Sequence, residues 1–257
     1  MARSPVRMPA GMQNVDYSQA LAAAGGEANY DGARKSHPLW MLPQPDANRL
    51  IDYDNDFHTY AAGDWTVVAG GAGSGAALSA GVGGILTLTA ATSGAESIQG
   101  NASFNFAAGQ QTWFGASVVM DATVANPDYE VGLTAGAASA LNSATDGVYF
   151  TKATTATVWS LVVKASSTAS TYALPASTLP VNSANVHLAY YYDGKDTITV
   201  YFNKVVVGTI GPSGTLGALT NLPVSTTPLA VTFLNAFHTA TSTLGVDYVL
   251  AACERAN

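Results

Sequence analysis

The sequence predicts an all-β protein, an antiparallel two-sheet sandwich preceded by an extended N-terminal arm, and three observations lead to this prediction. The chain of 257 residues is 48% hydrophobic and only 11% charged, so it can bury a large core but has few charges for exposed helix faces. From residue 52 onward, short runs of β-branched and aromatic residues are separated by Gly, Ser and Asn. No helical segment intervenes between these runs, which favours antiparallel pairing of consecutive strands.

Residues 1–51 form the predicted arm. Five prolines interrupt this segment, and proline fixes φ and removes an amide donor, so most of the arm is expected to be extended or irregular. One short helix is expected over 17–24, with Asp16 as its N-cap and two glycines after it. Residues 37–45 (HPLWMLPQP) are apolar but broken by proline, so they cannot form a central strand. We expect them to dock on the body of the chain or on a neighbouring molecule.

Residues 52–257 form the predicted sandwich domain. Strands are predicted near residues 65–69, 84–90, 97–106, 113–121, 129–135, 147–152, 157–164, 168–174, 186–192, 196–202, 204–210, 229–236 and 244–252. Residues 69–84, between the first two of these strands, are rich in Gly, Ala and Ser and are expected to form a flexible loop. Asp193-Gly194 predicts a two-residue type I′ hairpin turn, and Asn203-Lys204 predicts a second one.

Alternation along these runs predicts which side chains face the core. The predicted core includes Leu86, Leu88, Val118, Leu161, Leu188, Ile198, Val200, Phe202 and Tyr248. The single cysteine, Cys253, cannot form an intramolecular disulfide and is expected to be a buried free thiol.

The charges are distributed unevenly along the chain. The arm has five positive and four negative side chains, net +1, whereas the body has five positive and thirteen negative side chains, net −8. An acidic body does not fit a general nucleic-acid binder, which needs a basic surface. No apolar run reaches the roughly 18 residues of a membrane span, and the N-terminus lacks the apolar stretch of a secretory signal. We therefore expect no nucleic-acid or membrane partner, and synthesis in a cytoplasm.

The acidic side chains do not form the pattern of a glycoside hydrolase, which is a known use of β-sandwich folds. A retaining enzyme needs two carboxyl groups about 5 Å apart across a cleft. Glu96, Glu130 and Glu254 are isolated from one another, and Asp128 and Glu130 supply a single pair on one strand face. Asp128 and Glu130 are expected to be solvated charges at the end of a loop. The sequence therefore predicts no catalytic residues.

Metal-binding patterns are incomplete. Residues 52–56 (DYDND) begin like a calcium loop, but position 6 is Phe57 rather than Gly and position 12 is Gly63 rather than Glu. The four histidines are scattered without ligand spacing. We expect no metal and no cofactor, and a calcium site assembled from distant loops stays open as an alternative.

Several motifs in the body follow a known pattern. They are Asp56-Phe57 with Gly63-Asp64-Trp65-Thr66-Val67, Gly84-Ile85-Leu86-Thr87-Leu88-Thr89, Gly132-Leu133, Asp146-Gly147-Val148-Tyr149-Phe150, Leu188-Ala189-Tyr190-Tyr191-Tyr192-Asp193-Gly194 with Val200-Tyr201-Phe202-Asn203, and Val246-Asp247-Tyr248-Val249-Leu250-Ala251 with Glu254-Arg255. Together they resemble a concanavalin A-like (laminin G-like) jelly-roll domain, and the last is similar to the C-terminal strand of jelly-roll proteins from tailed-phage virions. The resemblance implies a non-enzymatic virion structural protein, a decoration or cement protein on the outer capsid surface.

The resemblance also implies partners, namely the major capsid protein and neighbouring copies of the chain in a homo-oligomer around a threefold axis. The candidate contact residues of the arm are Leu39, Trp40, Met41, Leu42 and Leu50. The alternative is a carbohydrate-binding, lectin-like jelly-roll module, displayed on a virion. In that alternative, aromatic side chains such as Trp113, Tyr149 and Trp159 would stack on sugars rather than pack inside the sandwich.

Overall fold

The computed structural model describes residues 50–70, 73–79, 84–92, 94–121, 127–136, 140–178, 183–236 and 241–255. These residues form β-strands and two three-residue 3-10 turns, η2 (Ala62–Asp64) and η3 (Ala176–Thr178). The described part of the chain has no helix with the length and apolar character that a bilayer crossing requires. The predicted all-β class is confirmed. The short helix expected over 17–24 and the arm residues Leu39, Trp40, Met41 and Leu42 lie outside the described residues.

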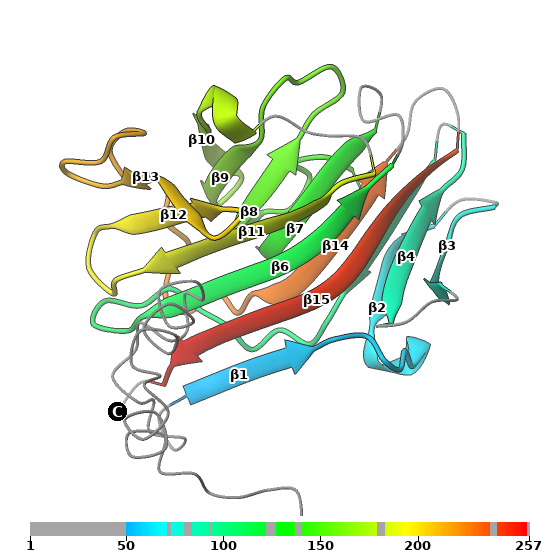
Figure 1. The fold of residues 1–257 in the computed structure, drawn as a ribbon. Coiled ribbons are helices and arrows are strands. Elements are labelled where there is room, and N and C mark those ends of the chain that lie inside the picture. Colours follow the sequence, from blue (N-terminus) through cyan, green and yellow to red (C-terminus); the bar gives the residue numbers. More distant parts are fainter. Residues whose placement is uncertain are drawn as a thin grey trace, which may run out of the picture. The chain divides into compact units, whose positions relative to one another are not determined.

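The strands form two antiparallel sheets (Figure 1). Sheet A contains β1 (Leu50–Asn55), β3 (Gly75–Ser79), β4 (Ile85–Ala90), β6 (Thr112–Met120), β11 (Asn185–Tyr192), β12 (Ile198–Phe202), β13 (Val205–Ile210) and β15 (Ser242–Glu254). Sheet B contains β2 (Thr66–Gly70), β5 (Ala95–Gln99), β7 (Asp128–Ala135), β8 (Asp146–Lys152), β9 (Ser160–Ala165), β10 (Thr168–Ala173) and β14 (Ala230–Ala236).

The strand orders are those of a jelly-roll sandwich. Sheet A has the order β13-β12-β11-β6-β15-β4-β3, and β1 also pairs with β15. Sheet B has the order β10-β9-β8-β7-β14-β5-β2. Figure 1 shows β11, β6 and β15 side by side in one layer, with β7 and β14 in the layer behind them. The core fills the space between the facing sides of the two sheets.

Alternation places the core residues as predicted. Along β4, Leu86, Leu88 and Ala90 are buried and the residues between them are half-buried. All the predicted core residues except Tyr248 are buried. Cys253 is a buried free thiol, as expected.

Tyr248 is half-buried and faces outward, so its assignment to the core was wrong. The reason is a β-bulge in β15: Val246 pairs with Val118 of β6, but Tyr248 pairs with the next residue, Ser117. The extra residue at position 247 reverses the alternation, and Val249 therefore faces the core.

Two buried polar side chains also connect the sheets. The Tyr190 hydroxyl of β11 donates a hydrogen bond of 2.9 Å to the Val148 carbonyl of β8. The Asn235 amide of β14 donates to the Leu88 carbonyl of β4 at 2.9 Å and to the Ser242 carbonyl of β15 at 3.0 Å. The Ser242 hydroxyl in turn donates to Asn235 Oδ1 at 2.9 Å. Sheet-to-sheet packing is thus fixed by directional bonds as well as by apolar contact.

The strand predictions need three corrections. The stretch 69–84, expected to be a flexible loop, contains β3, which pairs with β4 through residues Gly75–Ser79. The strand expected over 97–106 is shorter, because β5 ends at Gln99. The sandwich also begins at Leu50, whose backbone pairs with that of Glu254.

The two predicted hairpin turns differ in outcome. Asn203-Lys204 is a two-residue turn with positive φ at both positions, as predicted. The prediction of a two-residue turn at Asp193-Gly194 was wrong, because Tyr192 pairs with Ile198 and five residues lie between them. The side chain of Asp193 instead closes this five-residue turn. Its Oδ1 accepts hydrogen bonds from the backbone N–H groups of Lys195, Asp196 and Thr197, at 2.8, 3.1 and 3.1 Å.

Candidate functional site

A cluster of ionisable side chains lies on the outward face of sheet B. Glu130 of β7, Tyr149 of β8 and Lys164 of β9 project from three neighbouring strands, whose alternate residues Val131 and Phe150 face the core. The outward side chains are nevertheless almost inaccessible: Glu130 and Tyr149 are 0% exposed and Lys164 is 7% exposed. Charged side chains are rarely this buried without partners, so the cluster needs an explanation.

Their shared partner is Asn142, in the connection between β7 and β8. Its backbone N–H donates to Glu130 Oε2 at 2.9 Å, and its backbone carbonyl accepts from Lys164 Nζ at 2.6 Å. Its side-chain Oδ1 accepts from the Tyr149 hydroxyl at 3.2 Å. Asn142 has a φ of 59°, a left-handed conformation that asparagine tolerates better than most residues. Three side chains of the sheet therefore hold one residue of the loop by three different groups.

The electrostatics of the cluster are dominated by burial. Burial raises the pKa of the Glu130 carboxyl to about 7, and the N–H of Asn142 and the charge of Lys164 act in the opposite direction. Glu130 Oε1 has no hydrogen-bond partner among the described residues. Burial and the neighbouring Glu130 also raise the pKa of Tyr149 above its ordinary value. The cluster therefore contains a carboxyl group that can exchange a proton near neutral pH, beside an amine and a carboxamide.

The expectation that Asp128 and Glu130 are solvated was wrong. Asp128 is 7% exposed, and its Oδ1 accepts from both the backbone N–H and the hydroxyl of Thr154. Glu130 is covered because the connection containing Asn142 returns over the sheet. Neither contact could be predicted from the sequence, because each one joins a strand to a separate connection. Alternation along a strand says nothing about such contacts. Glu130 thus binds Asn142, and Asp128 binds Thr154.

The aromatic residues considered for sugar stacking do not lie together. Trp159 is inside the sandwich, stacked on Tyr129 with ring centroids 6.4 Å apart. Tyr149 belongs to the outward cluster of sheet B. Trp113 is on the outward face of sheet A, stacked on Tyr191 at 5.3 Å. These three side chains thus form no common platform for a sugar.

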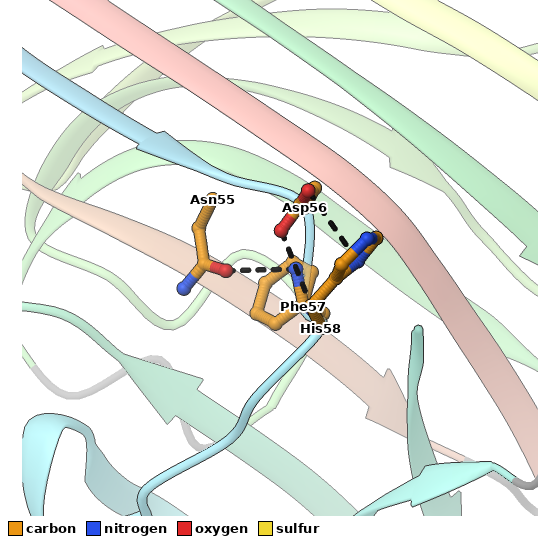
Figure 2. A network of polar contacts seen from close by, with 4 residues as sticks. All are labelled: Asn55, Asp56, Phe57 and His58. Atoms are coloured by element: carbon orange, nitrogen blue, oxygen red, sulfur yellow. Dashed lines mark hydrogen bonds and ion pairs between the residues drawn. The ribbon is translucent and has the colours of Figure 1, made fainter. Parts of the chain in front are cut away.

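The acidic segment at 52–56 is used for local turns (Figure 2). Asn55 Oδ1 accepts the backbone N–H of Phe57 at 2.8 Å. Asp56 accepts the backbone N–H of His58 at 3.3 Å and also lies 3.4 Å from His58 Nδ1, with both side chains about two-thirds exposed. This turn, with Phe57 at a φ of 52°, directs the Phe57 ring into the core. Across the described residues, no three His, Cys, Asp or Glu side chains gather as a metal site would require.

Of the five candidate contact residues of the arm, the structure describes only Leu50. Leu39, Trp40, Met41 and Leu42 lie outside the described residues, as do His37 and His238. The backbone of Leu50 belongs to β1, where it pairs with Glu254 of β15. The last predicted arm residues are therefore part of sheet A.

No protein-family profile and no curated protein sequence matches this chain. Many solved structures share its fold. The Emp47p carbohydrate recognition domain is 8% identical with a TM-score of 0.55, covering 82% of this chain and 100% of that one. The T. cruzi calreticulin globular domain is 9% identical with a TM-score of 0.56, covering 77% of this chain and 86% of that one. A Bacillus licheniformis beta-glucanase is 10% identical with a TM-score of 0.53, covering 80% and 98%.

These similarities establish a concanavalin A-like jelly-roll fold of the kind found in lectin and glycosidase domains. At this level of identity they show the fold alone. The similar structures include both carbohydrate-recognition domains and carbohydrate-cleaving enzymes, and nothing among them points to a phage capsid protein.

Proposed function

We propose that this chain is a non-enzymatic structural protein of a tailed-phage virion, which decorates and stabilises the outer capsid surface through its arm and through self-association. The observation that carries the proposal is the attachment of the arm. Its last residues, Leu50 and Ile51, are the first two residues of β1, which pairs over its whole length with β15. β15 in turn pairs with β6 and β4 in the middle of sheet A. A force applied to the arm would therefore be shared among several backbone hydrogen bonds of sheet A.

The composition of the arm supports the same proposal. Its net charge of +1 beside a body of net charge −8 favours contact with acidic surfaces, including other copies. Residues 37–45 supply one Trp, one Met and two Leu. Burying each such side chain contributes roughly 1.5–3 kcal/mol, enough for a few anchors to offset the ordering of an extended segment. The expected partners are the major capsid protein and neighbouring copies around a threefold axis.

The proposal is tested by capsid binding of the full-length chain. Replacing Leu39, Trp40, Met41 and Leu42 together by Ser should abolish co-sedimentation with capsids of the parent phage. The matched control replaces two exposed apolar residues of the body, Val205 and Val206, by Ser and should bind like wild type. Full occupancy of capsids by the arm variant would refute the role of the arm.

A second candidate function, carbohydrate binding, is favoured by the similarity to carbohydrate-recognition domains. A glycan array probed with the full-length chain tests it. Binding that is unaffected by the arm substitutions would favour this function over capsid decoration.

A further inference from the structure

The outward face of sheet B brings together an amine, a carboxamide and a carboxyl group. The first two can form an amide bond with each other, and the third can transfer the protons that this reaction requires. Lys164 supplies an amine whose Nζ lies 2.6 Å from the backbone oxygen of Asn142. Asn142 supplies a side-chain carboxamide in the same residue. Glu130, 0% exposed, supplies a carboxyl group that contacts Asn142 through Oε2 and has a second, unpartnered oxygen. The three residues come from β9, the β7–β8 connection and β7, and the fold brings them together.

The surroundings suit attack by the amine on the carboxamide carbon. The Tyr149 hydroxyl donates to Asn142 Oδ1 at 3.2 Å, so it polarises the carbonyl and can stabilise negative charge that develops on its oxygen. Lys164 is anchored on β9 and Glu130 on β7, and both bind the β7–β8 connection through Asn142, which holds the groups near one another. Asn142 is itself exposed to solvent, which gives a small leaving group a way out.

We propose that Lys164 and Asn142 form an intramolecular isopeptide bond, with Glu130 as the acid–base group. In its carboxylate form Glu130 accepts a proton from the Lys164 ammonium. The neutral Nζ then bonds to Cγ of Asn142, and the bond between Cγ and Nδ2 breaks. Glu130 returns this proton to Nδ2, which leaves as ammonia, and then takes up the second proton, which Nζ loses as it becomes an amide nitrogen. The reaction forms one C–N bond, breaks one C–N bond and needs no oxidant, metal or cofactor.

The position and protonation of Glu130 support this role. A lysine nucleophile must lose a proton before it attacks, and the departing nitrogen must gain one. A group that does both at neutral pH works best with a pKa near 7. Burial raises the pKa of Glu130 to about this value.

The bond would fasten the β7–β8 connection to β9 across β8. Its formation is independent of whether the chain decorates a capsid or binds a sugar, so the tests of the two proposals do not depend on each other.

The intact mass of the purified full-length chain tests the proposal. We expect the wild-type mass to be lower than the sequence mass by one ammonia, after allowance for removal of the first Met. We expect Glu130→Gln and Lys164→Arg to have their full sequence masses. Lys164→Arg keeps the positive charge and the donor but lacks a nucleophilic amine. The matched control, Lys195→Arg, changes an exposed lysine and should keep the ammonia loss.

Peptide mapping distinguishes the crosslink from other reactions of Asn142. In the crosslinked chain trypsin cannot cleave after Lys164, and a branched peptide joins Lys164 to Asn142. A succinimide between Asn142 and Ser143 would also lose ammonia, but it would leave Lys164 cleavable and would persist in Lys164→Arg. That result, or a wild-type mass equal to the sequence mass, would overturn the proposal. Persistence of the crosslink in a folded Glu130→Gln variant, with folding checked by circular dichroism, would overturn the role of Glu130.

Discussion

Asn235 joins the two sheets from a fully buried position, and its replacement by Ala should be costly. The substitution removes three hydrogen bonds: two from the Asn235 amide, to the Leu88 and Ser242 carbonyls at 2.9 and 3.0 Å, and one from the Ser242 hydroxyl at 2.9 Å. A neutral hydrogen bond contributes about 1 kcal/mol net, so the free energy of unfolding should fall by about 3 kcal/mol. For a domain of this size each kcal/mol lowers Tm by roughly 2–4 °C, which predicts a fall of roughly 6–12 °C.

Urea denaturation and differential scanning calorimetry of the full-length chain measure this effect. The matched control is Asn101→Ala, at an exposed asparagine, which should change the free energy of unfolding by less than about 0.5 kcal/mol. Asn235→Leu serves as a second variant, because it fills the space but restores none of the bonds; it should also be destabilised. If Asn235→Ala matched the control, the bonds between the sheets would be contributing nothing and the reasoning would be refuted.

Three further predictions concern single positions. Gly84→Ala should lower the urea midpoint by the equivalent of more than about 1 kcal/mol, since Gly84 has a φ of 56° and an added Cβ would collide with the Phe57 carbonyl; an unchanged midpoint would contradict this. Tyr190→Phe should cost about 1 kcal/mol by the same assay, because the Val148 carbonyl loses its donor across the core. Cys253 should react with a thiol reagent at pH 8 far more slowly in the folded chain than in denaturant, because burial blocks access and raises the pKa of the thiol. Equal labelling rates would show that the thiol is accessible.

The parts of the fold that depend on local pattern could be predicted from the sequence. The run 186–192 alternates so clearly that its core face, including Leu188, was identified correctly. β3 was missed because Gly75–Ser79 has small residues where a strand normally carries β-branched ones, and its pairing with β4 supplies what the sequence lacks. Tyr248 was misplaced because a bulge shifts the alternation by one residue. The sequence signal for it is Gly245, directly before the bulge, since a glycine inside a strand often marks such a site.

The cluster on sheet B could not have been predicted. Glu130 was recognised as one of few acidic residues, but its burial depends on a connection that folds back over the sheet. Lys164 belongs to the cluster because its strand, β9, is separated from β7, the strand of Glu130, by β8 alone. Asn142 carries no sequence signal, since a loop asparagine is common and its three hydrogen bonds all come from other elements. The site is therefore a product of strand order rather than of a motif.

β15 has a consequence for how the protein is made. It is the last strand of the sandwich in chain order, yet it lies in the middle of sheet A, where it pairs with β1, β4 and β6. Until the ribosome has released residues 242–254, β1 and β4 have no strand to connect them to β6 and β11. The nascent chain must therefore hold most of its apolar strands in an incomplete sheet while synthesis continues at roughly 5–20 residues per second. A chain truncated before residue 242 would keep the other described strands but would have no continuous sheet A.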